Sequence, residues 1–222
     1  MEGFPTANKG TDSKSPTLPV VETFHSLQGE GLHAGRSAFF IRLGGCTVGC
    51  SWCDTKHSWP QVIHARRTPE ELTAETSAAA SAGAAFVVIT GGEPLHHNLA
   101  PLCDALAGAG LPLHLETSGV DPLSGRFAWI TLSPKRHRPP LEGLLACCQE
   151  LKVIVHEPAD LAFAEAMARS ALQTRDPAAE RPVLLLQPGW QSAVGQALAL
   201  QHVQANPAWR LSLQSHKLLG VR

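Results

Sequence analysis

Short apolar runs alternate with helix-forming stretches along most of the chain, and this alternation restricts the fold more than any other feature. The candidate strands cover residues 38–43, 86–90, 113–115, 129–132, 151–155, 183–186 and 210–213. Candidate helices cover residues 68–82, 98–109, 161–172 and 192–204. This order predicts a single α/β domain with a mostly parallel sheet, built either as an open doubly wound sheet or as an incomplete barrel.

Local signals fix two helix ends. Thr68 is a good N-cap, Pro69 suits the first helical position, and Glu70 and Glu71 place acidic groups in the first turn. Gly110 suits the position after the last turn of the next helix, because glycine adopts a left-handed conformation at little cost. Residues 1–18 are rich in Gly, Pro, Ser, Thr and Lys and are predicted to be a flexible segment before a domain of residues 19–222.

The composition limits the cellular compartment and the binding partners that we expect for this chain. The formal net charge is −1, which gives no electrostatic reason to expect nucleic-acid binding. No apolar run approaches the ~20 residues that a membrane-spanning helix needs, and the first residues lack a secretory apolar core. We therefore expect a cytoplasmic protein that binds neither membrane nor nucleic acid.

A polar or glycine-rich motif follows five of the candidate strands. GGC follows residue 43, GGEP follows residue 90, ETSG follows residue 115, SPK follows residue 132 and QPGW follows residue 186. The carboxyl ends of parallel strands lie on one rim of a sheet, and ligand sites form there. The five motifs therefore predict one composite site for a ligand larger than a metal ion.

Three of the six cysteines, Cys46, Cys50 and Cys53, lie within eight residues, in a loop rich in glycine. Three thiolates can hold an iron–sulfur cluster and leave one iron open to a ligand. Structural zinc with His57 as a fourth ligand is an alternative, although CxxxCxxC followed by His is not a usual zinc spacing. A thioredoxin-like pair would not need Cys46, and ordinary buried cysteines would not cluster so tightly.

The segment CTVGCSWC, with Trp52 before the third cysteine, resembles the signature of the radical S-adenosylmethionine superfamily. TGGEP at residues 90–94 resembles the glycine-rich motif of the same superfamily. The resemblance implies a [4Fe–4S] cluster whose open iron binds the methionine part of S-adenosylmethionine. Reductive cleavage of the cofactor would then yield a 5′-deoxyadenosyl radical.

Three further segments, HSLQGEG, CSWCDTKHSW and LSLQSHKLLG, resemble the 7-carboxy-7-deazaguanine synthase family. That family has a compact, partial β/α barrel of the radical S-adenosylmethionine type. The resemblance implies conversion of 6-carboxy-5,6,7,8-tetrahydropterin to 7-carboxy-7-deazaguanine with loss of ammonia, in 7-deazapurine (queuosine) biosynthesis. It also implies regeneration of S-adenosylmethionine, a need for Mg²⁺, an electron donor such as flavodoxin or ferredoxin, and a homodimer.

The resemblance assigns roles by position. Cys46, Cys50 and Cys53 would hold the cluster, and Thr55 would bind Mg²⁺. The implied S-adenosylmethionine contacts are Trp52, Cys53, Asp54, Gly92, Ser133, Pro134 and Lys135, with Gln173, Thr174, Arg175 and Asp176 as weaker candidates at the nucleoside end. The implied substrate contacts are Leu27, Gln28, Gly29, Arg42, Thr90, Glu116 and the C-terminal Arg222.

The chemistry of several of these side chains suits their roles. A hydroxyl such as that of Thr55 is the oxygen ligand that Mg²⁺ prefers, although Thr55 could equally form a local turn. The guanidinium of Arg42 can bind a carboxylate through two hydrogen bonds, and its burial without a partner would be costly. Gln28 offers a donor and an acceptor to a pterin edge, and Glu116 offers an acceptor to substrate N–H groups.

Other polar residues have no assigned role. His216 and Lys217 either cover the site or lie in solvent. We interpret one further set as solvated loop residues: His96, His97, Arg136, His137 and Arg138.

Two other functions stay open from the sequence. One is a different radical S-adenosylmethionine enzyme, such as an activase of glycyl-radical enzymes or a peptide-modifying enzyme. The other is an iron–sulfur or zinc protein that senses or binds a partner without catalysis.

Overall fold

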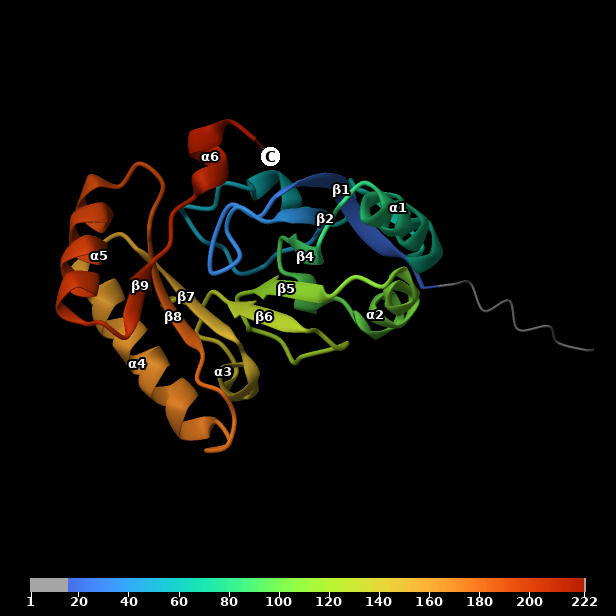
Figure 1. Cartoon of the computed structure of the whole chain (residues 1–222). Helices are drawn as coiled ribbons and strands as arrows, with labels where there is room; N and C mark the ends of the chain where they lie inside the picture. The colour runs from blue at the N-terminus through green and yellow to red at the C-terminus, as the bar shows by residue number, and fades with distance from the viewer. Residues whose placement is uncertain (1–15, 222) are drawn as a thin grey trace, which may run out of the picture.

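The computed structural model describes residues 16–221, and within them nine strands form one open sheet (Figure 1). The strands are β1 (Leu18–Leu27), β2 (Ser37–Leu43), β3 (Ala65–Arg67), β4 (Val87–Gly91), β5 (Leu113–Thr117), β6 (Trp129–Leu132), β7 (Glu150–Val155), β8 (Val183–Pro188) and β9 (Trp209–Leu211). Their order in the sheet is β3-β1-β2-β4-β5-β6-β7-β8-β9. β1 pairs antiparallel with β2 and β3, and every pair from β2 to β9 is parallel.

This order decides between the two predicted architectures. From β2 to β9 the strands follow one another in chain order, without the reversal that defines a doubly wound sheet. β3 and β9 form the two edges and do not pair, so the sheet does not close. The incomplete β/α barrel is therefore confirmed.

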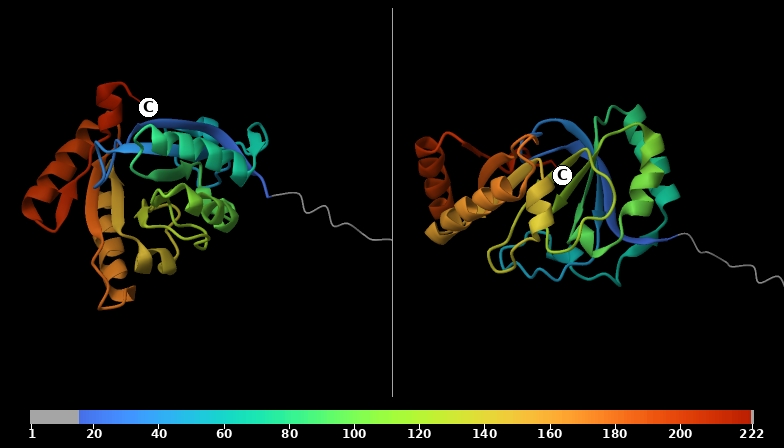
Figure 2. Two further views of the ribbon diagram at one scale, coloured as in Figure 1. Left: turned by 45° about the vertical axis from the view of Figure 1, so that its right-hand side comes forward. Right: turned by 90° about the horizontal axis from the view of Figure 1, so that it is seen from below.

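Apart from α6 (Ser215–Leu219), which lies at the end of the chain beside the segment after β1, the helices lie around the outside of the curved sheet (Figure 2). The other helices are α1 (Pro69–Ser81), α2 (Ala100–Leu106), α3 (Glu142–Cys147), α4 (Pro158–Thr174) and α5 (Ala193–Ala205). Short 3₁₀ helices cover Lys56–Ser58, Pro94–His96 and Ala107–Ala109. None of the helices in the described residues is long and apolar enough to cross a membrane.

The predicted helix ends are present. Thr68 Oγ1 accepts a hydrogen bond from the Glu71 backbone N–H at 3.3 Å, and Glu71 Oε2 accepts one from the Thr68 backbone N–H at 2.9 Å. This reciprocal capping box satisfies two N–H groups that the first turn leaves unpaired. Gly110 ends the second helical segment with φ of 73°.

Alternation along the strands separates the core from the site. Ile41, Ile89 and Leu115 are fully buried in the main core cluster. The residues one position later, Arg42, Thr90 and Glu116, line a cavity instead. Because successive side chains of a strand point to opposite faces, one face packs on the helices and the other carries polar groups.

The predicted boundaries need three corrections. Residues 1–15 of the predicted flexible segment lie outside the described residues, whereas Leu18 already begins β1 and is 7% exposed. The sequence pattern also missed β1, β3, α3 and α6. The predicted strand at 210–213 is β9, which begins at Trp209 and ends at Leu211.

Candidate active site

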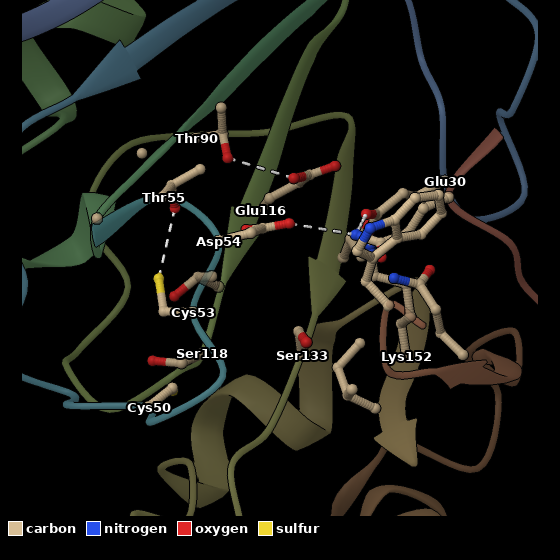
Figure 3. A pocket seen from close by; sticks show the side chains of 18 of the residues that line it. Glu30, Cys50, Cys53, Asp54, Thr55, Thr90, Glu116, Ser118, Ser133 and Lys152 are labelled. Atoms are coloured by element: carbon tan, nitrogen blue, oxygen red, sulfur yellow. Dashed lines mark hydrogen bonds and ion pairs between the residues drawn. The ribbon is translucent and has the colours of Figure 1, made fainter. Parts of the chain in front are cut away.

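A cavity of about 520 Å³ lies at the carboxyl ends of the parallel strands. Its walls come from the segments after β1, β2, β4, β5, β6, β7 and β8 (Figure 3). Gln214 and His216 from the end of the chain complete the lining. All five motifs that follow the predicted strands contribute to this one cavity, as the rim argument predicts.

The loop after β2 brings all three clustered cysteines to the cavity. Cys50 is buried, whereas Cys46 and Cys53 are half-buried. Burial raises the pKa of the Cys46 and Cys50 thiols, so their thiolate forms need positive charge nearby. A bound metal supplies such charge, and Lys135 adds a cation that favours the Cys50 thiolate.

Neighbouring side chains position the third cysteine. Trp59 Nε1 donates a hydrogen bond to Cys53 Sγ at 3.4 Å. Thr55 Oγ1 lies 3.5 Å from the same sulfur, as Figure 3 shows. A sulfur in contact with both groups is held in place for ligation.

The donor set fits an iron–sulfur cluster better than a single ion. Within residues 16–221, no three His, Cys, Asp or Glu side chains are arranged to hold one metal ion. His57, the fourth ligand considered for zinc, does not line the cavity. Three thiols on one loop facing one cavity are the ligands that iron–sulfur clusters use.

The glycine-rich loop after β4 packs directly on the start of the cysteine loop. A Cβ at Gly91 would lie 2.1 Å from the Leu43 carbonyl oxygen, and a Cβ at Gly92 would lie 2.4 Å from that of Gly45. The backbone N–H of Gly92 donates to the Leu43 carbonyl at 2.9 Å, and that of Glu93 donates to Gly45 at 2.9 Å. Only glycine permits this approach, so the GGEP motif fixes the geometry of both loops.

Glu93 serves as an anchor for the loop. Its carboxylate is 1% exposed and accepts hydrogen bonds from Thr117 Oγ1 at 2.5 Å and from the backbone N–H of Ser118 at 2.8 Å. The backbone N–H of Leu95 is a third donor, at 3.1 Å. A buried carboxylate needs such donors, and these join the β4 loop to the end of β5.

Glu116 presents a carboxylate to the opposite part of the cavity. Gln28 Nε2 donates to Glu116 Oε1 at 2.9 Å, and Thr90 Oγ1 donates to Oε2 at 3.2 Å. Thr90 is the register partner of Arg42 on the adjacent strand. One acceptor and one cation therefore lie on the same face of the sheet.

Arg42 is oriented by residues of β1. Its Nε donates to Glu22 Oε1 at 2.9 Å, and its guanidinium carbon lies 5.7 Å from the centre of the Phe24 ring. The Phe24 ring stacks on that of Phe40, with centroids 4.8 Å apart. The half-buried guanidinium therefore has a fixed direction toward the cavity, which suits an anionic ligand group.

The end of the chain covers the cavity. The backbone N–H of Ser215, at the start of α6, donates to the Gly29 carbonyl at 2.9 Å. The Lys217 ammonium binds the Asp54 carboxylate and lies 5.0 Å from the centre of the Trp190 ring. Of the two interpretations of His216 and Lys217, the structure therefore supports a cover over the site.

Comparisons with known proteins agree with this geometry. Residues 40–127 match the radical SAM superfamily. The chain is 53% identical to 7-carboxy-7-deazaguanine synthase from Prochlorococcus marinus, over 93% of this chain and 99% of the relative, and 35% identical to the synthase from Escherichia coli, over 91% and 98%. It also matches the crystal structure of QueE from Escherichia coli with a TM-score of 0.77 and 35% identity, over 90% of this chain and 95% of that chain.

The chain belongs to the 7-carboxy-7-deazaguanine synthase family. It is therefore a radical S-adenosylmethionine enzyme, for which a [4Fe–4S] cluster and S-adenosylmethionine are the family's cofactors.

Most of the site residues predicted for this synthase line the one cavity: Leu27, Gln28, Gly29, Arg42, Cys46, Cys50, Trp52, Cys53, Asp54, Thr55, Thr90, Gly92, Glu116, Ser133 and Lys135. Pro134 is buried between the last two and does not line the cavity. Arg222 lies outside the described residues.

Gln173, Thr174, Arg175 and Asp176 need correction. They lie at the end of α4 and just after it. Arg175 Nη1 donates to the Glu180 carbonyl at 2.8 Å, and Nη2 donates to the carbonyl of Cys148, which precedes β7. This segment therefore lies at the amino ends of the strands, whereas the cavity lies at their carboxyl ends. It is not a contact for the nucleoside end of the cofactor.

Several residues that line the cavity had no contact assigned to them from the sequence. Glu30 lies inside HSLQGEG, and the segment 187–190 is the QPGW motif, yet neither received a role. Lys152 is 3% exposed and lies within an apolar run. Because lysine is rarely buried without a partner, its place in the sequence already indicates a paired or functional side chain. His156 follows β7 and lines the cavity, with its ring centre 5.2 Å from that of Trp52.

The interpretation of five polar residues as solvated was wrong for His96, His97 and Arg138, which are half-buried, whereas His137 is exposed. His97 Nε2 lies 2.8 Å from the Gly44 carbonyl oxygen, and His137 Nε2 lies 3.1 Å from that of Val48. His96 and Arg138 contact the backbone of the cysteine loop at Thr47. Arg136 is exposed and pairs with Glu157 and Asp160.

Proposed function

We propose that this chain converts 6-carboxy-5,6,7,8-tetrahydropterin to 7-carboxy-7-deazaguanine with loss of ammonia. The observation that supports it best is the cavity itself. It joins three cysteines and a glycine loop to an arginine and a carboxylate on one sheet face, in a chain of this family. The first group suits a cluster and its cofactor, and the second suits a carboxylated pterin.

In this proposal Cys46, Cys50 and Cys53 hold the cluster. When bound, the cluster and S-adenosylmethionine supply abstraction of a hydrogen atom from the substrate. S-adenosylmethionine would contact Trp52, Asp54, Gly92, Ser133 and Lys135. Gly92 leaves backbone groups accessible to the cofactor, because no side chain stands in the way.

Recognition of the pterin would fall to residues on the other side of the cavity, with Leu27 and Gly29 contributing their backbones. Arg42 would bind the substrate carboxylate. Its Nε donates to Glu22 at 2.9 Å, which orients the two terminal nitrogens of the guanidinium before the substrate binds. Glu116 would accept hydrogen bonds from substrate N–H groups. Gln28 and Thr90 donate to Glu116 at 2.9 and 3.2 Å and would keep its carboxylate oriented.

Thr55 would offer its hydroxyl to Mg²⁺. Its Oγ1 is 3.5 Å from Cys53 Sγ and Thr55 lines the cavity, so its hydroxyl would be one of the oxygen ligands that Mg²⁺ prefers. Thr55→Ala should raise the Mg²⁺ concentration needed for half-maximal activity, whereas Thr55→Ser should not.

The deciding experiment is an anaerobic assay of the reconstituted protein. Carboxytetrahydropterin, S-adenosylmethionine, Mg²⁺ and a reductant are added, and the deazapurine is followed by absorbance and mass spectrometry. Product formation with little net loss of S-adenosylmethionine is expected. Deoxyadenosine release without pterin turnover would favour a different radical enzyme, and zinc without iron or sulfide would favour a binding protein.

Three further properties belong to this proposal. A low-potential donor such as flavodoxin or ferredoxin would reduce the cluster. The enzyme would act in the cytoplasm, where thiols stay reduced. It would form a homodimer, the commonest assembly of small enzymes.

A further inference from the structure

The segment between the first two cluster cysteines is held from outside by polar side chains of other loops. Thr47 follows Cys46 and is exposed. Its backbone N–H donates to His96 Nε2 at 3.1 Å, and its carbonyl oxygen accepts from Arg138 Nη1 at 2.8 Å. Arg138 Nη1 also lies 3.0 Å from Thr47 Oγ1.

The contact with Asp121 determines which ring nitrogen of His96 carries the proton. The Asp121 carboxylate binds His96 Nδ1, so this nitrogen carries the proton and Nε2 keeps the lone pair that accepts from Thr47. The His96 side chain is 16% exposed and that of Asp121 is 31% exposed. His96 belongs to the 3₁₀ turn after the GGEP motif, whereas Asp121 follows β5.

Arg138 reaches the same residue from the turn after β6. His137, its neighbour, contacts the carbonyl oxygen of Val48 at 3.1 Å. Two separate strand-end loops, after β4 and after β6, therefore contact the peptide groups that separate Cys46 from Cys50, and Asp121 after β5 supports one of them through His96. A loop with a left-handed Gly49, at φ of 78°, gains a definite shape from such external contacts.

We infer that His96, Asp121 and Arg138 are positioning residues for the cluster, because they fix the backbone of Thr47 and thereby the spacing of the Cys46 and Cys50 thiolates. This inference rests on the proposed function, in which these cysteines are cluster ligands. Partners that orient metal ligands contribute to metal affinity without touching the metal. The three residues would act in this way through a peptide group.

The expected effect lies in retention of the cluster more than in stability of the fold. Thr47 is exposed, so water replaces the lost partners in a variant and no polar group is buried unpaired. Loss of a partner that orients a metal ligand typically lowers metal affinity on the order of 10–100-fold. We expect His96→Leu and Arg138→Met to release iron to a chelator about tenfold faster than the parent protein.

A matched control is available on the far side of the molecule. The His202 side chain is also 16% exposed, and its Nε2 lies 2.9 Å from Glu165 Oε1 on α4. His202→Leu removes a histidine–carboxylate pair of the same kind without reaching the cysteine loop. His96→Gln keeps a polar group near the position of Nε2 and should restore slow iron release.

The test uses full-length protein reconstituted anaerobically. Iron and sulfide per chain, the rate of iron release, and the electron paramagnetic resonance spectrum of the reduced cluster with and without S-adenosylmethionine are measured. Faster release and a broadened spectrum in His96→Leu and Arg138→Met, with recovery in His96→Gln, support the inference. Release at the parent rate, or no faster than in His202→Leu, overturns it.

Failure of the proposed function gives a different result. In that case the parent protein itself forms no four-iron cluster or no deazapurine. A parent that forms both, with variants that behave like it, would refute only the positioning role.

Discussion

Lys152 on β7 forms an ion pair with Glu30 in the segment after β1, although 122 positions separate them in the chain. Burial alone would raise the pKa of Glu30, but the Lys152 ammonium outweighs it and lowers the pKa to about 2. Gln214 Nε2 also donates to Glu30 Oε1 at 2.8 Å. One carboxylate therefore links the sheet, the first loop of the cavity and the end of the chain.

Lys152→Met should lower the free energy of unfolding of the cluster-free protein by up to about 3 kcal/mol, because it leaves the Glu30 carboxylate, whose side chain is only 18% exposed, without its cation. The double variant Glu30→Gln with Lys152→Met should regain most of the lost unfolding free energy, since neither side chain then carries a charge without a partner. Denaturant unfolding under reducing conditions measures both. Equal destabilisation by the single and double variants would show that the pair contributes little electrostatically.

The Glu30–Lys152 pair also predicts that the fold loses stability at acid pH. The unfolded chain protonates Glu30 near 4.5, whereas the folded pKa is about 2. The stabilisation from this group is therefore present above about pH 4.5 and is lost as pH falls toward 2. In Glu30→Gln the fall in unfolding free energy over this window should be shallower than in the parent, as measured by denaturant unfolding at several pH values.

The buried His114 predicts a second pH range, above that of Glu30, in which the stability of the fold changes. Its burial, together with the nearby charges of His33 and Arg36, lowers its pKa from 6.5 to about 3. Because the unfolded chain takes up a proton that the folded chain refuses, stability should fall as pH drops from 6.5 to 3, by at most about 1.4 kcal/mol per pH unit. His114→Phe keeps an aromatic ring beside Phe86, whose centroid is 4.2 Å from the His114 ring. An unchanged slope in this variant would contradict the prediction.

Gly92→Ala should impair cluster assembly. Its Cβ would lie 2.4 Å from the Gly45 carbonyl oxygen and 2.8 Å from the Cys46 Cβ, so the cysteine loop must shift. Gly143→Ala is the control, because a Cβ there meets no atom within 4 Å and lies in α3. We expect iron content well below one cluster per chain in the first variant and parent content in the second.

Arg42→Lys should lower kcat/KM for the pterin about 10–100-fold, mainly by raising KM. A single ammonium cannot reproduce the paired hydrogen bonds of a guanidinium, and such binding is lost in the ground state as well as in the transition state. Arg126→Lys is a control, because the Arg126 side chain is 94% exposed. Steady-state kinetics under anaerobic conditions measure both; a fall in kcat with unchanged KM would assign Arg42 a different role.

Elements whose signals are local could be predicted from the residues alone. Cysteine spacing, paired glycines and the capping residue Thr68 need only a few neighbouring positions, and all are found where the pattern places them. The shared cavity at the carboxyl ends of the strands was also predictable, because parallel strands bring these ends to one rim of the sheet. β1 was missed because it is a partly exposed antiparallel strand with polar side chains among the apolar ones.

Contacts between distant groups could not be predicted in this way, because they depend on how the folded segments pack. The Glu30–Lys152 pair, the cover formed by Ser215 and Lys217, and the contacts of His96 and Arg138 with Thr47 join segments far apart in the chain. The same is true of Arg175, which lies at the wrong end of the sheet for a cofactor contact. Periodicity reports which face a residue occupies, whereas the partner of a polar side chain depends on how strands and loops pack in three dimensions.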